Sequence, residues 1–311
     1  MRVVFFGTPQ FAVASLNAIM LSAHEVVGVV TVADKPSGRG QRMTESDVKR
    51  YAVQNDLPLL QPQRLRDPDF LSALRAWNAD VFVVVAFRML PEEVWSMPLK
   101  GTFNLHAALL PRYRGAAPIN HALINGDIET GVTTFLLNHN IDEGDILMQV
   151  PTPISPLDNA ETLHDRLADL GRRLVLDTLD GLEKGTLKPR KQMGTPTLAP
   201  KIFKNDCRIN LNQPTQKVVN FVRGLSPYPG AFVTMQRPDG QMVDIKIYSA
   251  SATITGQAAV GQLLTDGKEA LKLGTADGYI CVEYLQMSGK RKNSVADFLR
   301  GNKLSGWKLV L

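Results

Sequence analysis

The sequence predicts an α/β protein in two parts: a Rossmann-like domain built on a mostly parallel sheet, followed by a small OB-like β-barrel. In the first half, short apolar runs alternate with segments of helical periodicity. Around residues 185–207 the chain becomes rich in Pro, Gly and basic residues without a regular period, and short strand-like segments dominate after it. With 311 residues the chain is long enough for two cores. We therefore expect one domain over 1–188, a linker over 189–206 and a barrel over 207–311.

The expected strands of the first domain are near-continuous apolar runs, which indicates that helices cover both faces of the sheet. These strands are 2–6, 25–32, 80–87, 102–106 and 131–137. The expected helices are 11–23, 47–55, 69–78, 117–125 and 159–184, the last as one long helix or two short ones. The first strand is followed by Gly7-Thr8-Pro9, and proline suits the first turn of a helix. Because no G-x-G-x-x-G pattern lies near this turn, a dinucleotide site of the usual kind is not expected.

The second domain is expected to be mainly β-structure. Its strands are 231–235, 243–250, 270–275 and 279–287, separated by Gly and Asp-Gly turns, and its one substantial helix is 215–225. Short strands at this density suggest a small barrel, an architecture that often binds oligonucleotides.

Composition is that of an ordinary globular protein, with 44% hydrophobic and 21% charged residues. The longest apolar run, 81–87, is far shorter than the roughly 20 residues that span a bilayer. The N-terminal apolar stretch is too short for a secretory signal. Cys207 and Cys281 lie far apart without metal-ligand spacing, so we expect reduced thiols in a cytoplasmic protein, with one disulfide between them as the alternative.

The charge is unevenly distributed. The net charge is +5, and from Cys207 onward there are 13 Lys and Arg residues against 7 Asp and Glu residues. The whole positive excess therefore lies in the last third of the chain. This distribution is typical of a polyanion-binding domain attached to a neutral one, although a solvated basic surface would also produce it.

Two polar side chains at the end of an expected strand are candidates for chemistry. Asn104 and His106 are two residues apart, so their side chains point to the same face. Ligands of open α/β sheets bind beyond the carboxyl ends of the strands. There an amide and an imidazole could donate hydrogen bonds to a developing oxyanion. The alternative is that His106 is a structural residue at a strand end.

A carboxylate follows the next strand. Asp142 lies in an expected turn with Gly144 behind it. From a neighbouring loop it could orient the imidazole of His106 and stabilise its charge. Taken alone, Asp142, Glu143 and Asp145 could equally be solvated turn residues.

Together these segments resemble the 10-formyltetrahydrofolate-dependent formyltransferases. The shared pattern is N-x-H, then S-L-L-P-x-x-R-G-x-x-P, then D-x-G-D. It corresponds here to Asn104-Leu-His106, to Ala108-Leu109-Leu110-Pro111 with Arg114-Gly115 and Pro118, and to Asp142-Glu-Gly-Asp145. The resemblance implies that Asn104, His106 and Asp142 are catalytic and that Ala108, Leu109, Leu110 and Pro111 contact the folate co-substrate. It implies no metal and no covalent enzyme intermediate.

Further segments resemble the formyltransferases that act on methionyl-tRNA. Residues 33–43 resemble their basic insertion loop, in which Lys35, Arg39 and Arg42 would meet phosphates and Arg39 would reach toward the acceptor end of the tRNA. Residues 198–206 and 218–232 resemble their linker and the opening of their C-terminal domain. Lys290, Arg291 and Lys292 form the densest basic cluster of the expected barrel. The implied reaction is formylation of the α-amino group of methionyl initiator tRNA for translation initiation, by a monomer.

The chain departs from the family pattern at two places. Ala108 stands where the family usually has serine, which removes one hydroxyl contact. Residues 87–91 are one residue shorter than the usual Y-G-x-x-L-P and lack its glycine.

Other functions remain open at this point. The alternatives are a formyltransferase acting on a nucleotide-linked amino sugar, a glycinamide ribonucleotide formyltransferase, a non-catalytic RNA-binding protein, and a hydrolase of formyl-folate.

Overall fold

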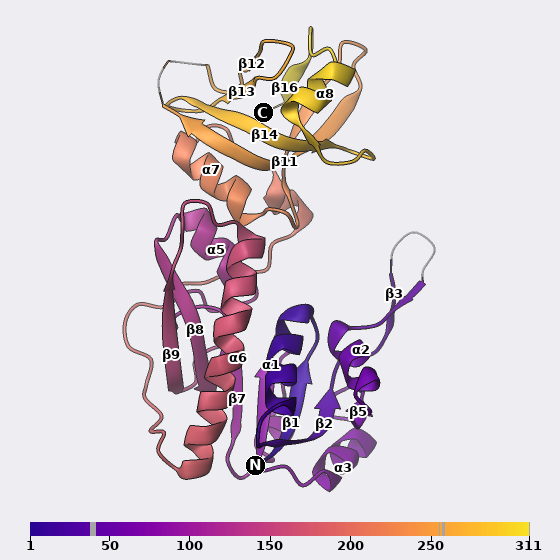
Figure 1. The fold of residues 1–311 in the computed structure, drawn as a ribbon, viewed down its shortest axis with the longest axis vertical. Coiled ribbons are helices and arrows are strands. Elements are labelled where there is room, and N and C mark those ends of the chain that lie inside the picture. The colour runs from indigo at the N-terminus through magenta and orange to yellow at the C-terminus, as the bar shows by residue number, and fades with distance from the viewer. Residues whose placement is uncertain (38–41, 255, 257–258, 311) are drawn as a thin grey trace. The chain divides into compact units, whose positions relative to one another are not determined.

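The computed structural model describes residues 1–37, 42–254, 256 and 259–310, and the chain forms two compact units (Figure 1). The first unit is Met1–Ala116, Glu129–Pro153 and His164–Ala199; the second is Ala117–Ile128, Ile154–Leu163 and Pro200–Leu311. The units are thus discontinuous in sequence, in contrast to the single division expected at 189–206. That division into domains stays a proposal.

The first unit is built on a seven-stranded sheet with the strand order β5-β2-β1-β6-β7-β8-β9. Its strands are β1 (Arg2–Gly7), β2 (Glu25–Val30), β5 (Leu59–Leu60), β6 (Val81–Val85), β7 (Thr102–His106), β8 (Glu129–Leu136) and β9 (Ile146–Pro153). The pairs from β5 to β7 are parallel, and β7-β8 and β8-β9 are antiparallel. The prediction of a mostly parallel sheet is confirmed. The sequence did not predict β9, an edge strand that contains two prolines, which suit an edge because they donate no ladder hydrogen bond.

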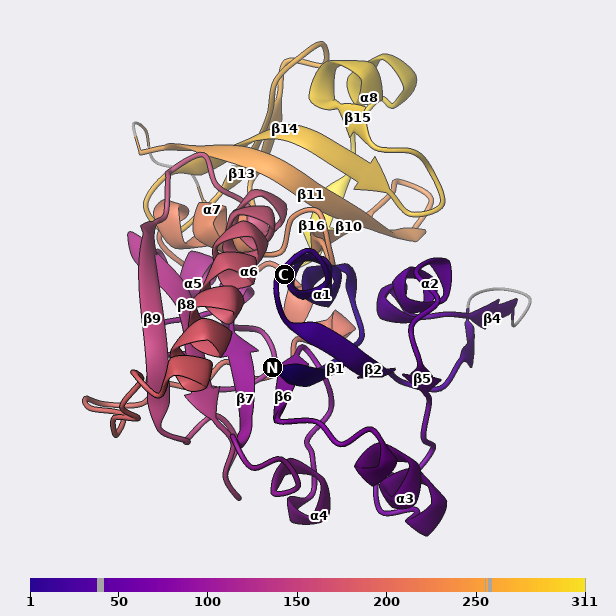
Figure 2. The ribbon, with the colours of Figure 1, turned by 60° about the horizontal axis from the view of Figure 1, so that its bottom comes forward.

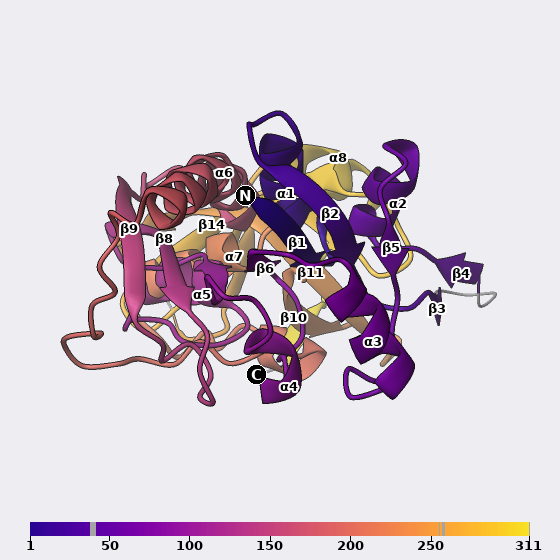
Figure 3. The same cartoon turned by 90° about the horizontal axis from the view of Figure 1, so that it is seen from below.

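Helices cover both faces of this sheet (Figure 3). The helices of the unit are α1 (Gln10–Met20), α2 (Asp47–Gln54), α3 (Pro68–Ala76), α4 (Glu92–Trp95) and most of α6 (Ala160–Lys184). Val4 and Phe6 of β1 pack with Phe70 of α3 and Val94 of α4. On the other face lie α1 and α6, and the Thr134 hydroxyl on β8 lies 2.9 Å from that of Thr178 on α6. Helix α6 is one continuous helix of 25 residues, which decides between the two sequence alternatives.

Beside the β5 edge, a small two-stranded sheet pairs β3 (Lys35–Ser37) with β4 (Arg42–Thr44), close to α2 (Figure 2). Its register joins Lys35 to Thr44. The segment 33–43, which the sequence predicted to be a basic loop, therefore contains β3 and most of β4, the two paired strands. Residues 38–41 between them lie outside the described part of the chain.

The second unit contains an antiparallel sheet with the strand order β12-β13-β14-β11-β10-β16, coiled into a nearly closed barrel. Its strands are β10 (Ala231–Gln236), β11 (Met242–Thr253), β12 (Leu263–Thr265), β13 (Leu271–Gly274), β14 (Tyr279–Met287), β15 (Asn293–Ser294) and β16 (Lys308–Val310). The register shifts where β11 pairs with β14 around Ser249, and such irregularities bend a strand. The barrel-like domain that the sequence predicted is confirmed.

Helices complete the second unit. They are α5 (Pro118–Asn125), the short η1 (Lys204–Cys207), α7 (Thr215–Gly224) and α8 (Val295–Gly301), the last of which the sequence did not predict. The excursion 117–128 belongs to this unit because α5 meets α7: the Asn120 amide donates to the Gly224 carbonyl at 2.7 Å. The excursion 154–163 belongs to it because the Arg223 guanidinium donates to the Ser155 carbonyl at 3.1 Å.

Neither cysteine forms a disulfide. Among the residues described, none of the helices combines the length and the apolar character that crossing a bilayer requires.

Candidate active site

The site lies at the carboxyl end of β7, in the first unit. Asn104 and His106 alternate with Leu105 along this strand and therefore point to the same face. His106 is 6% exposed, and Asn104 is half-buried. Because β7 runs parallel to β6 and β1, its end belongs to the sheet edge where α/β proteins bind ligands.

The imidazole of His106 is oriented by a backbone carbonyl. Its Nε2 lies 2.8 Å from the carbonyl oxygen of Tyr113. A carbonyl can only accept, so Nε2 carries the hydrogen and Nδ1 is the nitrogen left for chemistry. Sequence reasoning missed Tyr113 because the contact uses its backbone, which adopts the left-handed conformation with φ 61°.

The structure brings Asp142 next to that free nitrogen. Its Oδ2 lies 3.8 Å from His106 Nδ1, and the two side chains are 14% and 6% exposed. This distance exceeds that of a hydrogen bond but allows strong electrostatic attraction to a protonated ring. The same Oδ2 accepts a hydrogen bond from the backbone N–H of Gly115 at 2.7 Å. His106 and Asp142 are 36 positions apart in the sequence and lie next to each other in the structure, as the sequence predicted.

The loop that carries Asp142 joins β8 to β9. Asp142 itself has φ 53°, the left-handed region that few residues other than glycine adopt. Gly144 is required there because a Cβ at this position would lie 1.6 Å from the Leu136 carbonyl oxygen. The pairing of β8 with β9 turns the loop back toward β7.

The Asn104 amide has no hydrogen-bond partner among the described residues. A half-buried amide beside an imidazole can donate to a carbonyl oxygen of a bound ligand. The structure thus places Asn104 and His106 on one face of β7 and Asp142 next to the His106 imidazole, and a catalytic role for the three residues is a proposal.

Residues Ala108–Pro111 are held from behind by two polar side chains. The buried hydroxyl of Thr133 donates to the Ala108 carbonyl at 2.6 Å and accepts from the Leu110 N–H at 3.2 Å. Gln149 Nε2 donates to the Leu110 carbonyl at 2.9 Å and to Thr133 Oγ1 at 3.0 Å. Sequence reasoning missed both supports, which lie on β8 and β9.

The Ala108 side chain is fully buried. A serine hydroxyl at this position would therefore face the protein interior rather than solvent, and the change from serine removes no exposed group. Leu109 and Pro111 are half-buried and are the side chains of the segment that a ligand can reach.

The shortened segment 87–91 follows β6 at the same sheet edge. Ala86 just before it is left-handed, with φ 47°. The Phe87 ring packs on Phe6 with centroids 5.7 Å apart, and the Arg88 guanidinium donates to the carbonyls of Pro62 and Gln63. The segment is thus anchored without the usual glycine, and burial lowers the pKa of Arg88.

The basic residues expected to bind tRNA fall into both units. Lys35 is exposed on β3. Arg39 lies outside the described residues, and for Arg42 only the backbone is described. Lys290, Arg291 and Lys292 are exposed and lie between β14 and β15 in the second unit.

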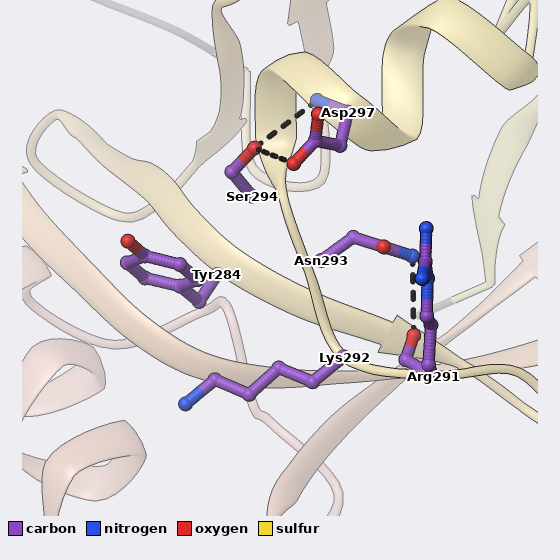
Figure 4. A pocket seen from close by; sticks show the side chains of 6 residues that line it. All are labelled: Tyr284, Arg291, Lys292, Asn293, Ser294 and Asp297. Atoms are coloured by element: carbon purple, nitrogen blue, oxygen red, sulfur yellow. Dashed lines mark hydrogen bonds between the residues drawn. The ribbon is translucent and has the colours of Figure 1, made fainter.

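The basic cluster borders a hollow of about 640 Å³ on the second unit (Figure 4). Its lining residues are Tyr284, Arg291, Lys292, Asn293, Ser294 and Asp297. The Lys292 ammonium lies 5.0 Å from the centre of the Tyr248 ring and 5.2 Å from that of Tyr284. Such cation–π contacts hold the lysine near the surface while leaving its charge available. Burial raises the pKa of the Tyr248 hydroxyl.

Within the described residues, one group of side chains has the composition of a metal site: His24, Asp180 and Glu183. The α-amino group of Met1 already lies 3.2 Å from His24 Nδ1 and 2.9 Å from Glu183 Oε1. His24 precedes β2, so the group lies at the amino-terminal edge of the parallel strands, opposite the candidate active site. We assign it no catalytic role.

Comparisons with known proteins point to one family. Residues 1–179 match the model of the family described as "Formyl transferase", and residues 201–303 match "Formyl transferase, C-terminal domain". The chain is 50% identical over 316 residues to methionyl-tRNA formyltransferase of Bacteroides thetaiotaomicron, covering 99% of this chain and 98% of that protein.

Two solved structures share the fold. An N-formyltransferase from Helicobacter canadensis, solved with folinic acid and dTDP-3-aminofucose, has a TM-score of 0.63 at 19% identity, covering 94% of this chain and 99% of that one. Methionyl-tRNA formyltransferase from Clostridium thermocellum has a TM-score of 0.54 at 15% identity, covering 82% and 95%. At these identities the likeness shows the fold alone.

Proposed function

The chain belongs to the formyl transferase family, and from this premise we propose that it transfers the formyl group of 10-formyltetrahydrofolate to the α-amino group of methionyl initiator tRNA. The product would be formylmethionyl-tRNA for translation initiation, which places the enzyme in the cytoplasm. The observation that carries the proposal is the approach of His106 Nδ1 to the Asp142 carboxylate at 3.8 Å, on the sheet face that also carries Asn104.

The proposed chemistry begins with attack of the acceptor amine on the formyl carbon. Negative charge builds on the formyl oxygen, and the Asn104 amide donates a hydrogen bond to it. The amine proton passes to His106 Nδ1, directly or through water, and the imidazolium is stabilised by Asp142. Protonated Nδ1 is then a second donor toward the oxyanion.

Collapse of the tetrahedral intermediate completes the transfer. The bond between the formyl carbon and N10 of the folate breaks, and N10 leaves with the electron pair and takes up a proton from His106. His106 returns to its neutral form. The ring keeps its orientation throughout, because Nε2 stays bonded to the Tyr113 carbonyl.

The folate fits residues of this chain. The half-buried Leu109 and Pro111 can contact its ring system, and Thr133 and Gln149 hold the backbone of that segment. The formyl group supplies a carbonyl oxygen to the Asn104 amide, which lacks a partner among the described residues.

Two features support a tRNA as the acceptor. A relative that matches nearly the whole chain at 50% identity carries the name methionyl-tRNA formyltransferase. The part of the second unit from Cys207 onward holds the positive excess and presents Lys290, Arg291 and Lys292 at its surface, which suits a phosphate backbone. A nucleotide-linked amino sugar would have less use for such a surface.

The test is formyl transfer from 10-formyltetrahydrofolate to initiator methionyl-tRNA, with uncharged tRNA and an amino-sugar nucleotide in parallel. We expect formylation of the charged tRNA alone. Formylation of the sugar nucleotide alone would overturn the acceptor but keep the chemistry. Release of free formate without a formylated product would identify a hydrolase instead.

A further inference from the structure

Residues 190–199, expected to be part of the linker over 189–206, run along the candidate active site within the first unit. The segment has no regular secondary structure. It is tied down near both ends by isolated β-bridges, from Arg190 to Ile146 and from Leu198 to Arg114. Ile146 follows the Asp142 loop, and Arg114 precedes Gly115, so the segment contacts both sides of the site.

Gln192 binds the Asp142 loop directly. Its Nε2 donates to the carbonyl of Asp142 at 2.8 Å and to that of Gly144 at 3.0 Å. Its Oε1 accepts from Arg114 Nη2 at 2.8 Å and from Nε at 3.2 Å. Arg114 in turn donates to Glu143 Oε1 at 2.6 Å. One amide side chain therefore holds the carbonyl of the left-handed Asp142 and that of Gly144 two residues later, and a left-handed conformation needs such support from its surroundings.

The far end of the segment holds the groups that contact the catalytic side chains. The Arg114 N–H donates to the Thr197 carbonyl at 2.9 Å, and the Ala199 N–H donates to the Arg114 carbonyl at 2.7 Å. Gly115 has φ 124° and passes so close that a Cβ would lie 2.6 Å from the Ala199 carbonyl oxygen. These contacts fix the Gly115 N–H, which donates to Asp142.

His106 is reached through Tyr113. The Thr197 hydroxyl accepts a hydrogen bond from the Tyr113 N–H at 2.8 Å. The carbonyl of Tyr113 accepts a hydrogen bond from His106 Nε2. The left-handed backbone of Tyr113 is thus held from the segment on one side while it orients the imidazole on the other.

We propose that residues 190–199 are a positioning strap of the active site, in which Gln192 sets the place of Asp142 and Thr197 sets the orientation of His106 through Tyr113. The catalytic role of this strap depends on the proposed formyl transfer. Both residues act through backbone groups: Gln192 through the carbonyls of Asp142 and Gly144, and Thr197 through Tyr113, whose carbonyl orients His106. A linker that only connected the two units would make none of these contacts.

The experiment compares four variants with the full-length wild-type chain. Gln192→Glu keeps an acceptor for Arg114 but replaces the donor to the two loop carbonyls by a carboxylate oxygen. Thr197→Val removes the acceptor for the Tyr113 N–H at nearly constant shape, and Thr197→Ser restores it. Met193→Ala is the matched control, because this neighbouring side chain is 81% exposed.

In steady-state formyl transfer, we expect kcat to fall about 10-fold to 100-fold for Gln192→Glu and Thr197→Val, the range found when supports of reacting groups are displaced. KM for the folate and the thermal midpoint should stay near the wild-type values. A general loss of folding would not lower kcat while leaving these two quantities unchanged. Thr197→Ser should recover most of the rate, and Met193→Ala should be unchanged. Full kcat in both Gln192→Glu and Thr197→Val would overturn the strap.

Amide hydrogen exchange tests the strap independently of activity. We expect exchange about 10-fold faster in residues 113–115 and 140–145 of the two damaging variants, with β1 and β6 unchanged. If the wild-type chain formylates no acceptor, the proposed function fails, and this measurement alone decides the strap. Unchanged exchange in both segments would refute it.

Discussion

The candidate active site and the basic cluster of the second unit are held in different ways. His106 and Asp142 are 6% and 14% exposed, and each is held by a hydrogen bond to a backbone group. His106 donates to the Tyr113 carbonyl, and Asp142 accepts from the Gly115 N–H. Lys290 and Arg291 are exposed side chains on a loop.

The difference matches what we propose that each region binds. Reaction at one carbon atom needs donors placed within a fraction of an ångström. A phosphate backbone can be bound by charges that adjust to it. Substitutions in the first region should therefore change rate constants, whereas those in the second should change affinity and its dependence on salt.

The largest expected effect tests the buried side of this comparison. Asp142→Asn keeps the shape and can still accept from the Gly115 N–H, but it removes the charge beside His106 Nδ1. We expect kcat to fall about 1000-fold, as for loss of a group in acid–base catalysis, with an unchanged thermal midpoint. The matched control is Asp145→Asn, because Asp145 lies in the same loop and pairs with Lys191 at 2.9 Å at the surface. Equal rates for the two variants would contradict the role of Asp142.

A smaller effect is expected behind the folate segment. Thr133→Val removes the hydroxyl that joins the Ala108 carbonyl to the Leu110 N–H. Leaving these groups unpaired costs about 1–2 kcal/mol, so KM for the formyl donor should rise about 10-fold, with little change in KM for the acceptor. Thr133→Ser keeps the hydroxyl and should behave like wild type in the same steady-state assay. If KM for the folate stays unchanged in Thr133→Val, the segment does not contact the folate.

The exposed side of the comparison predicts changes in affinity alone. Replacing Lys290 and Arg291 by glutamine should weaken tRNA binding and reduce the slope of log affinity against log salt by about 2, one for each phosphate that is no longer neutralised. The rate constant at saturating tRNA should not change. Filter binding at several salt concentrations measures this, with Lys268→Gln as a control, since Lys268 is another exposed lysine of the second unit. The same slope in all three proteins would show that the cluster meets no phosphates.

The smallest effect concerns the stability of the second unit. The N–H and hydroxyl of Thr215 both donate to Asp277 Oδ1 at 2.7 Å, and these bonds hold the pKa of Asp277 below its usual 3.8. Because the folded pKa is lowered, the stabilisation is present above pH 3.8 and is lost as pH falls through the folded value. Thermal unfolding followed by circular dichroism should show Asp277→Asn less stable than wild type at pH 6, and the difference should shrink below pH 4.

A second carboxylate in the same unit should behave alike. The N–H groups of Lys268, Glu269 and Ala270 donate to Asp266 and lower its pKa to about 2. Wild-type stability should therefore keep falling from about pH 4 to about pH 2. For Asp277, a difference in thermal stability between wild type and Asp277→Asn that grows as the pH falls would contradict the lowered pKa of the Asp277 carboxyl.

Several elements could be predicted from the sequence because their signals are local. The run 2–6 is apolar throughout and became β1, and the amphipathic period over 159–184 became α6. Edge and short elements escaped prediction. Strand β9 contains prolines and α8 has seven residues, so neither carries a clear period.

The candidate site divides in the same way. Asn104, His106 and Asp142 could be proposed as catalytic from the sequence because their side-chain types suit the chemistry and stand in a spaced pattern. Tyr113, Gln192 and Thr197 could not, because they act through backbone groups or through contacts between distant segments. Gly115 stands in the pattern, but the pattern does not show that its N–H binds Asp142. No residue type marks a carbonyl that orients a ring.

By itself the sequence determined the fold class and the family and singled out the three side chains that we propose as catalytic, since these depend on local periodicity and on residue identity. Only the tertiary structure decided which nitrogen of His106 faces Asp142 and that residues 190–199 belong to the site. The physical reason is that both depend on hydrogen bonds between backbone groups far apart in the chain. Every residue offers such groups, and only the folded chain selects which of them meet.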